Sequence, residues 1–183
     1  MFLPPQPIPL CVTALTILTA STDITSRRIP NRVIAIGLAA ALLVQVWLHG
    51  PLAGGEEWLT GALTGFAVLL PFYLLRGMAA GDVKLMLTIG AWVGPALTVR
   101  IALATFVIGG IWSLWVTLRH GRMRQLLVNL WCIASHAGHP GLPQTGELGY
   151  QQNESVGSLP YGVAIAAGTL GVLFASAAWP YNL

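Results

Sequence analysis

Long apolar stretches, separated by short polar connections, run through almost the whole chain and constrain its fold more than any other feature. Of the 183 residues, 55% are hydrophobic and only 8% are charged, whereas a soluble domain usually carries about a quarter charged residues. A transmembrane helix needs roughly 20 apolar residues. We therefore expect an all-α polytopic membrane bundle that forms one domain over residues 1–183.

Six apolar segments are expected to form the transmembrane helices. The first helix should start near Pro9 and is short unless it continues past Asp23, and Asn31 is the expected N-cap of the second. The fourth segment stops at Gly94-Pro95, so it either begins earlier than drawn or is a half-depth helix inside the bundle. The six segments cover residues 3–22, 33–48, 58–75, 81–93, 96–118 and 159–179.

The basic residues predict the orientation of the bundle, because cytoplasmic connections of membrane proteins are enriched in Lys and Arg. With both termini outside, the outer connections hold only Arg100. The cytoplasmic connections hold Arg27, Arg28, Arg32, Arg76, Lys84, Arg119, Arg122 and Arg124. This bias predicts a multi-pass membrane protein with three cytoplasmic connections and gives no reason to expect a nucleic-acid partner. The basic residues follow the first apolar stretch, which favours a retained helix over a cleaved signal.

The third cytoplasmic connection, residues 119–158, is the longest. Apolar residues at helical spacing over 122–135 predict an interfacial helix, and the Gly-, Pro- and Ser-rich residues 136–158 predict a flexible part. His136 and His139 form an HxxH pair, but no nearby carboxylate or cysteine completes a metal site. The two cysteines, Cys11 and Cys132, form no CxxC pair. We therefore expect neither a metal nor another cofactor.

The acidic residues are the informative polar groups, because the chain has only six. Four of them fall in the predicted connections: Glu56, Glu57, Glu147 and Glu154. The other two, Asp23 and Asp82, lie at the cytoplasmic edges of the first and fourth apolar segments. Carboxylates placed toward hydrocarbon are costly, so residues of this kind are usually functional or paired.

Two carboxylates on the same side of a bundle can share a proton. The ionised group can then activate a water molecule while the protonated group donates to a substrate carbonyl. This is the chemistry of an aspartic peptidase. The alternative is structural, with each aspartate capping a helix or pairing with a neighbouring base, Arg27 or Lys84. Position alone leaves both interpretations open.

Three sequence stretches together resemble the type IV prepilin leader peptidases, a family of GxGD intramembrane aspartic peptidases. DITSRRIPNR at residues 23–32 is similar to the family's aspartate, basic stretch and Ile-Pro-Asn. AAGDVKL at 79–85 is similar to its GxGD signature, and LPYGVAIAAG at 159–168 to the opening of its last helix. The stretches occur in the family's order and cover nearly the whole chain outside 119–158.

The resemblance implies that Asp23 and Asp82 are the catalytic pair. Gly81 would allow close backbone approach beside Asp82, whereas Lys84 is given no chemical role. The supporting motif residues are Pro30, Asn31, Ala79, Gly81, Lys84, Pro160, Tyr161 and Gly162. The chain departs from the family's pattern at Ala79, which replaces the first glycine of GxGD.

The implied substrate is a prepilin or pseudopilin with a short basic leader, cleaved at the cytoplasmic face of the membrane. Larger family members carry a cysteine-rich insert between the first two helices and also N-methylate the new terminus. The interval 23–32 has no room for such an insert, so the chain resembles the short, peptidase-only enzymes of tight-adherence (Tad/Flp) pilus systems. A membrane transporter and a non-catalytic pilus-assembly subunit are the alternative functions.

Overall fold

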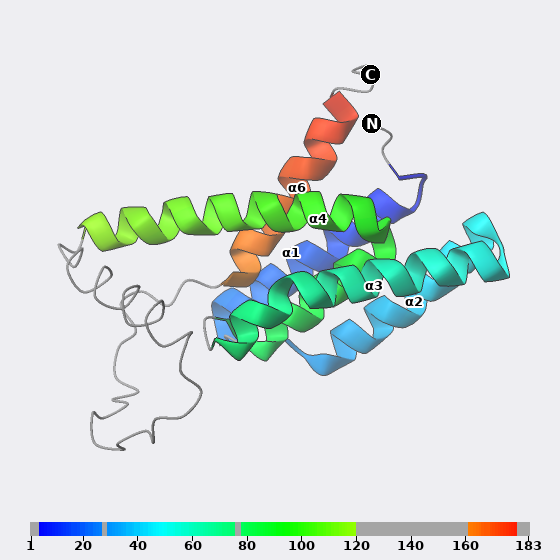
Figure 1. Cartoon of the computed structure of the whole chain (residues 1–183), viewed down its shortest axis with the longest axis horizontal. Coiled ribbons are helices and arrows are strands. Elements are labelled where there is room, and N and C mark those ends of the chain that lie inside the picture. The colour runs from blue at the N-terminus through cyan, green and yellow to red at the C-terminus, as the bar shows by residue number, and fades with distance from the viewer. Residues whose placement is uncertain (1–3, 27–28, 76–77, 120–160, 179–183) are drawn as a thin grey trace. The chain divides into compact units, whose positions relative to one another are not determined.

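A computed structural model describes residues 4–26, 29–75, 78–119 and 161–178, and regular structure in these ranges is entirely helical (Figure 1). Among the described residues, five helices are long and apolar enough to cross a membrane. They are α1 (Ile8–Ser26), α2 (Asn31–His49), α3 (Pro51–Leu74), α4 (Ala80–Arg119) and α6 (Tyr161–Ala178). The predicted all-α polytopic bundle is confirmed, and the predicted segments 81–93 and 96–118 both lie within α4.

Two of the predicted boundaries are wrong. Pro30 is the N-cap of α2 and makes no side-chain cap bond, while Asn31 is already the first helical residue. Helix α3 begins at Pro51, seven residues before the predicted segment, because Pro51 occupies the first turn, where its missing N–H costs nothing. The predicted interfacial helix at 122–135 and the predicted flexible part at 136–158 lie outside the described residues.

Helix α4 is broken at the predicted place. Gly94 has φ 77° and ψ 173°, outside the helical region, and Pro95 follows it. In a straight helix Gly90 and Thr98 would be about 12 Å apart along the axis. A Cβ built at Gly90 would instead lie 3.2 Å from the Thr98 hydroxyl oxygen, so the chain turns back sharply at Gly94.

The carbonyl groups that end the first part of α4 are bound by a side chain from another helix. Gln45 of α2 is buried, and its amide nitrogen donates to the carbonyl of Trp92 at 2.8 Å. Carbonyls at a helix end have no partner within the helix, and water does not reach them inside a bilayer. The Gln45 amide therefore stabilises the break by satisfying one of these carbonyls.

The chain divides into two compact units, residues 1–109 with 160–183, and residues 110–159. Only residues 110–119 of the second unit are described, the last turns of α4. There the rings of Trp112 and Trp115 lie 5.6 Å apart, and the Arg119 guanidinium lies 5.1 Å from the Trp115 ring. Tryptophan and arginine at a helix end are typical of a membrane–water interface.

In the first unit, α3 packs on its neighbours through glycines. A Cβ at Gly61 would overlap the carbonyl oxygen of Gly90, and a Cβ at Gly90 would overlap that of Gly61. Gly65 lies in the same way against Met86, and Gly54 against the backbone of Gln45 in α2. Small residues at four-residue spacing let transmembrane helices approach to backbone contact. We call the contact of Gly61 and Gly65 with Gly90 and Met86 the glycine seam.

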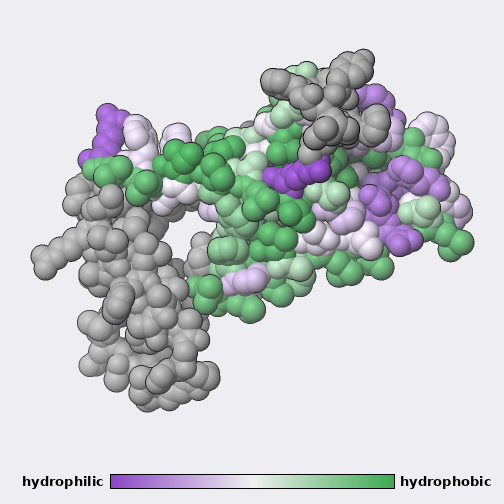
Figure 2. Space-filling view, turned by 45° about the horizontal axis from the view of Figure 1, so that its top comes forward, coloured by the Kyte–Doolittle hydropathy of each residue, from purple (hydrophilic) through white to green (hydrophobic). Residues whose placement is uncertain are grey.

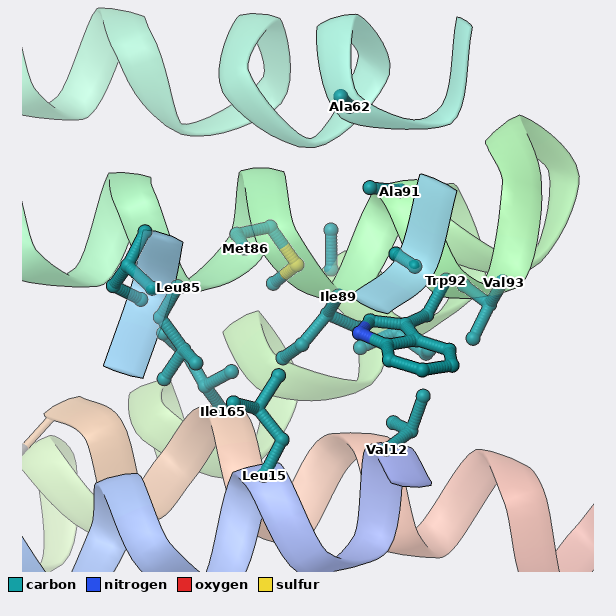
Figure 3. Close-up of a cluster of buried hydrophobic side chains, with 14 of the residues drawn as sticks. Val12, Leu15, Ala62, Leu85, Met86, Ile89, Ala91, Trp92, Val93 and Ile165 are labelled. Carbon is teal, nitrogen blue, oxygen red and sulfur yellow. The ribbon is translucent and has the colours of Figure 1, made fainter. Parts of the chain in front are cut away.

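The apolar core surrounds the first part of α4. Figure 3 shows Leu85, Met86 and Ile89 between side chains of α1 and α6 on one side and of α3 on the other. All three are fully buried. On the face seen in Figure 2, apolar residues form broad areas of the surface, as expected where a bundle contacts lipid. The first turn of α4, with Asp82, is thereby fixed within the packed interior of the bundle.

Candidate active site

Asp23 ends the buried face of α1. The buried residues of this helix recur at helical spacing, from Ile8 through Val12 to Thr16, Thr19 and Asp23. The hydroxyls of Thr16 and Thr19 donate to carbonyls of their own helix, so they need no hydrogen-bond partner from another helix. Asp23 cannot do the same, because a carboxylate only accepts hydrogen bonds. It is 8% exposed and needs a donor from elsewhere in the bundle.

The donor to Asp23 comes from the first turn of α6. The Gly162 amide N–H donates to Oδ2 of Asp23 at 3.0 Å, across 139 residues of sequence. A Cβ at residue 162 would lie 2.7 Å from that oxygen and 3.1 Å from the carboxyl carbon. The first N–H groups of a helix have no intrahelical partner and favour negative charge. Glycine therefore leaves both the space and the donor that a buried carboxylate requires.

Asp82 lies in the first turn of α4 and is 5% exposed. Its Oδ2 accepts the Ala79 N–H at 3.3 Å, and its own N–H donates to the Ala79 carbonyl at 3.1 Å. Asp82 thus closes the start of its own helix, which is the structural role that the sequence left open. This local bond occupies one carboxylate oxygen, Oδ2.

The two aspartates come from different helices, and short contacts connect their segments. Asp23 accepts the N–H of Gly162, at the start of α6, and Ile29, in the connection after α1, contacts Gly81 beside Asp82. Starts or ends of three helices, α1, α4 and α6, therefore converge on one polar site inside an apolar bundle. Close carboxylates can divide the roles of acid and base, which is what hydrolysis of an amide requires.

The supporting motif residues lie around this site. Gly81 faces Ile29 of the connection between α1 and α2, with its Cβ position 3.6 Å from that side chain. Lys84 donates from Nζ to Oδ1 of Asn31 at 3.1 Å. The supposed pairing partner of Asp82 is thus bound to Asn31, and Arg27, the supposed partner of Asp23, lies outside the described residues, as does Pro160. Pro30 and Ala79 are exposed and flank the site as ends of their helices.

Gly109 of α4 contacts Tyr161, which the sequence did not predict. A Cβ there would lie 3.3 Å from the hydroxyl oxygen of Tyr161. The Gly109-Gly110 pair inside an apolar run was the available signal, because adjacent small residues permit close approach of a ring or backbone.

A set of side chains suited to bind a metal ion is absent from the part of the chain that the structure describes. There, no group of three His, Cys, Asp or Glu residues is placed to hold an ion. The HxxH pair of His136 and His139 lies outside the described residues.

Known proteins resemble this chain over its N-terminal and central parts. The model of the type IV leader peptidase family matches residues 10–114, which include both aspartates. The prepilin leader peptidase/N-methyltransferases of Burkholderia pseudomallei strains 1026b and K96243 are each 32% identical over 122 residues, which cover 63% of this chain. The match covers only 38% of each relative's length. No solved structure matches significantly.

Proposed function

The chain belongs to the type IV leader peptidase family, and we propose on this basis that it is a membrane-embedded aspartic endopeptidase with Asp23 and Asp82 as its catalytic pair. The observation that carries the proposal is the burial of two carboxylates on separate helices, each with one oxygen that accepts a backbone N–H. Buried carboxylates in an apolar bundle cost stability, and residues of this kind are usually functional or paired.

The proposed mechanism assigns different roles to the two carboxyl groups within one turnover. One is ionised and takes a proton from a water molecule while the water oxygen attacks the scissile carbonyl carbon. The other is protonated and donates to the carbonyl oxygen, so the tetrahedral intermediate forms without a free oxyanion. The intermediate then collapses and the C–N bond breaks. The leaving amine takes the proton that the first carboxyl group received from water, and a hydroxyl group of the intermediate returns a proton to the second carboxylate.

The elements around the pair support this division of labour. Each aspartate has one oxygen held by a backbone N–H, from Gly162 or from Ala79. Fixed donors keep both side chains in one rotamer, and this preorganisation lowers the cost of reaching the transition state.

We propose a prepilin or pseudopilin as the substrate, with a short basic leader on the cytoplasmic side and an apolar helix in the bilayer. The site lies where α1 ends and α4 begins, at one end of the apolar segments, so a bond at the junction of leader and helix would meet it. The enzyme would lie in a bacterial cytoplasmic membrane with both termini outside, because the basic residues favour that orientation.

The proposed activity is peptidase without N-methyltransferase. Helix α1 ends at Ser26 and α2 begins at Asn31, so only residues 27–30 connect them. This connection has no space for the cysteine-rich insert expected of the larger enzymes. Methylation of the cleaved pilin would require another protein.

The experiment that tests the proposal is prepilin processing in membranes, with wild type compared with Asp23→Asn and Asp82→Asn. Asn keeps the size of the side chain but cannot act as a general acid or base. We expect each substitution to lower cleavage by at least about 1,000-fold, the order of magnitude lost when a catalytic group of a peptidase is removed. Cleavage is followed by the mobility shift of the prepilin and by N-terminal sequencing of the product.

Abundance and thermal unfolding of each variant in detergent control for misfolding. A well-folded Asp→Asn variant that cleaves at the normal rate would show that its aspartate is structural. That result would favour the alternative of a non-catalytic assembly subunit, for which the capping bond of Asp82 is the supporting observation.

A further inference from the structure

The connection between α1 and α2 is fastened to the first turns of α4 at two points. The first is a hydrogen bond from Lys84 Nζ to Asn31 Oδ1, at 3.1 Å across 53 residues. The second is an apolar contact, because the Ile29 side chain covers Gly81, whose Cβ position lies 3.6 Å from it. We call these two contacts together the clasp.

The clasp spans the two segments that carry the aspartates. Ile29 and Asn31 follow Asp23 on one side of the contact, while Gly81 and Lys84 flank Asp82 on the other. Asp23 is otherwise held by α6, through the Gly162 amide. Nothing in that bond fixes α1 relative to α4, so the separation of the two carboxylates depends on other contacts between their segments.

We propose that Asn31 and Lys84 are positioning residues, whose bond holds the connection after Asp23 against the helix of Asp82 and keeps the two carboxylates at working separation. The inference rests on the proposed peptidase function. It gives Lys84 a role through Asn31 rather than through the substrate. It also explains why Asn31 is not an N-cap: its side-chain oxygen is used by Lys84 instead of by its own helix.

The position of the clasp suits this role. Asn31 and Lys84 are exposed, so they contribute little to the core, whereas Ile29 is half-buried against it. Replacing the two polar residues should therefore disturb the geometry of the site more than the fold. Reaction rates are sensitive to displacements of about 1 Å in a catalytic pair, while ground-state substrate binding is less so.

The first test removes each side of the bond in the full-length protein reconstituted with a prepilin in liposomes. We expect Lys84→Met and Asn31→Leu each to lower kcat about five-fold, the size of one hydrogen bond, with KM almost unchanged. The double variant should be no worse than either single one, because both remove the same interaction. Asn31→Asp, which keeps the acceptor oxygens, should retain activity.

Arg32→Gln is the matched control. Arg32 adjoins Asn31 and is also exposed, so its replacement removes a nearby positive charge and leaves the clasp intact. Its kcat should equal that of wild type. An additive loss in the Lys84→Met, Asn31→Leu double variant would overturn the proposal, because it would show two independent roles. A raised KM with unchanged kcat would also overturn it and place Lys84 in substrate binding.

A second test locks the clasp covalently. The Cβ of Ile29 lies 3.6 Å from the Cβ position of Gly81, within the range found in disulfides. Ile29→Cys with Gly81→Cys, in a chain whose Cys11 and Cys132 are replaced by serine, should oxidise readily in membranes. Under oxidation, the added Lys84→Met substitution should no longer lower kcat, whereas under reduction the five-fold loss should return. A loss that persists in the oxidised protein would overturn the proposal.

The controls separate this inference from the peptidase proposal. If the wild type cleaves the prepilin and Asp23→Asn does not, the peptidase proposal is supported. The clasp variants then test only the role of the clasp. If wild type cleaves no prepilin, the peptidase proposal and the role of the clasp fail together, while ready formation of the 29–81 disulfide would still verify the contact.

Discussion

Two regions of the molecule depend on the absence of a side chain, but they use the vacant space differently. In the glycine seam, Gly61 and Gly90 bring the backbones of α3 and α4 into direct contact. In the candidate active site, Gly162 leaves room for the carboxylate of Asp23 and donates its N–H to it. The seam holds the helices together, whereas in the site the absence of a side chain makes room for a carboxylate.

The comparison indicates where an added methyl group should affect folding and where it should affect activity. Backbone atoms in the seam cannot move without moving whole helices, so an added Cβ acts on folding. The carboxylate at Gly162 is the end of a side chain that can rotate away, so an added Cβ there acts on activity. The following substitutions are ordered by the size of the effect that we expect.

The largest effect is expected from Gly90→Ala in the seam. Its Cβ would overlap the Gly61 carbonyl oxygen, and overpacking of a tight contact typically costs about 1–3 kcal/mol, more where backbone must shift. We expect a fall in membrane abundance and in Tm measured in detergent. Gly55→Ala is the control, because a Cβ at Gly55 meets nothing within 4 Å. Equal Tm values for the two variants would contradict the close contact of α3 and α4.

A smaller effect, confined to activity, is expected from Gly162→Ala. The new Cβ would lie 2.7 Å from Oδ2 of Asp23 and push the carboxylate off its amide donor. We expect kcat for prepilin cleavage to fall about 10-fold, equivalent to about 1.4 kcal/mol, while KM and Tm stay close to wild type. If instead Tm falls as far as in Gly90→Ala, the site and the seam do not differ in the way proposed.

The smallest effect is expected from Gly171→Ala, on the exposed side of the same helix α6. A Cβ at Gly171 meets nothing within 4 Å, and alanine is preferred over glycine inside a helix by about 0.5–1 kcal/mol. Tm should rise slightly and kcat should not change. A loss of activity here would mean that α6 tolerates no substitution and that the result at Gly162 is not specific to Asp23.

The sequence predicted the helices well where apolar runs are bounded by glycine, proline or charge. Gly94-Pro95 marked the break in α4, and α1 continues past Asp23 as a helix of spanning length requires. The start of α3 was not predicted, because the glycines and glutamates at residues 54–57 are typical of a loop exposed to water. Contact of Gly54 with the backbone of α2 makes a helical start possible there.

The sequence predicted that Asp23 and Asp82 lie close together, from their common depth in the membrane and from the resemblance of their motifs. It could not predict the partners of these residues, because partner choice depends on contacts between distant segments. Asn31 has the composition of an N-cap, yet its oxygen binds Lys84. The motif included Gly162, but it did not indicate that the Gly162 amide binds Asp23, since every non-proline residue carries a backbone N–H.

The sharp turn of α4 has a consequence for the surrounding lipid. The first part of this helix, residues 80–93, is about 21 Å long at 1.5 Å per residue, whereas the hydrocarbon of a bilayer is about 30 Å thick. Asp82 and Gly94 therefore cannot both reach the surface of an undistorted bilayer. Either the lipid thins beside the bundle or water descends to the carboxylates. We therefore expect acyl-chain length to affect the proposed hydrolysis, as a control set by the membrane rather than by the protein.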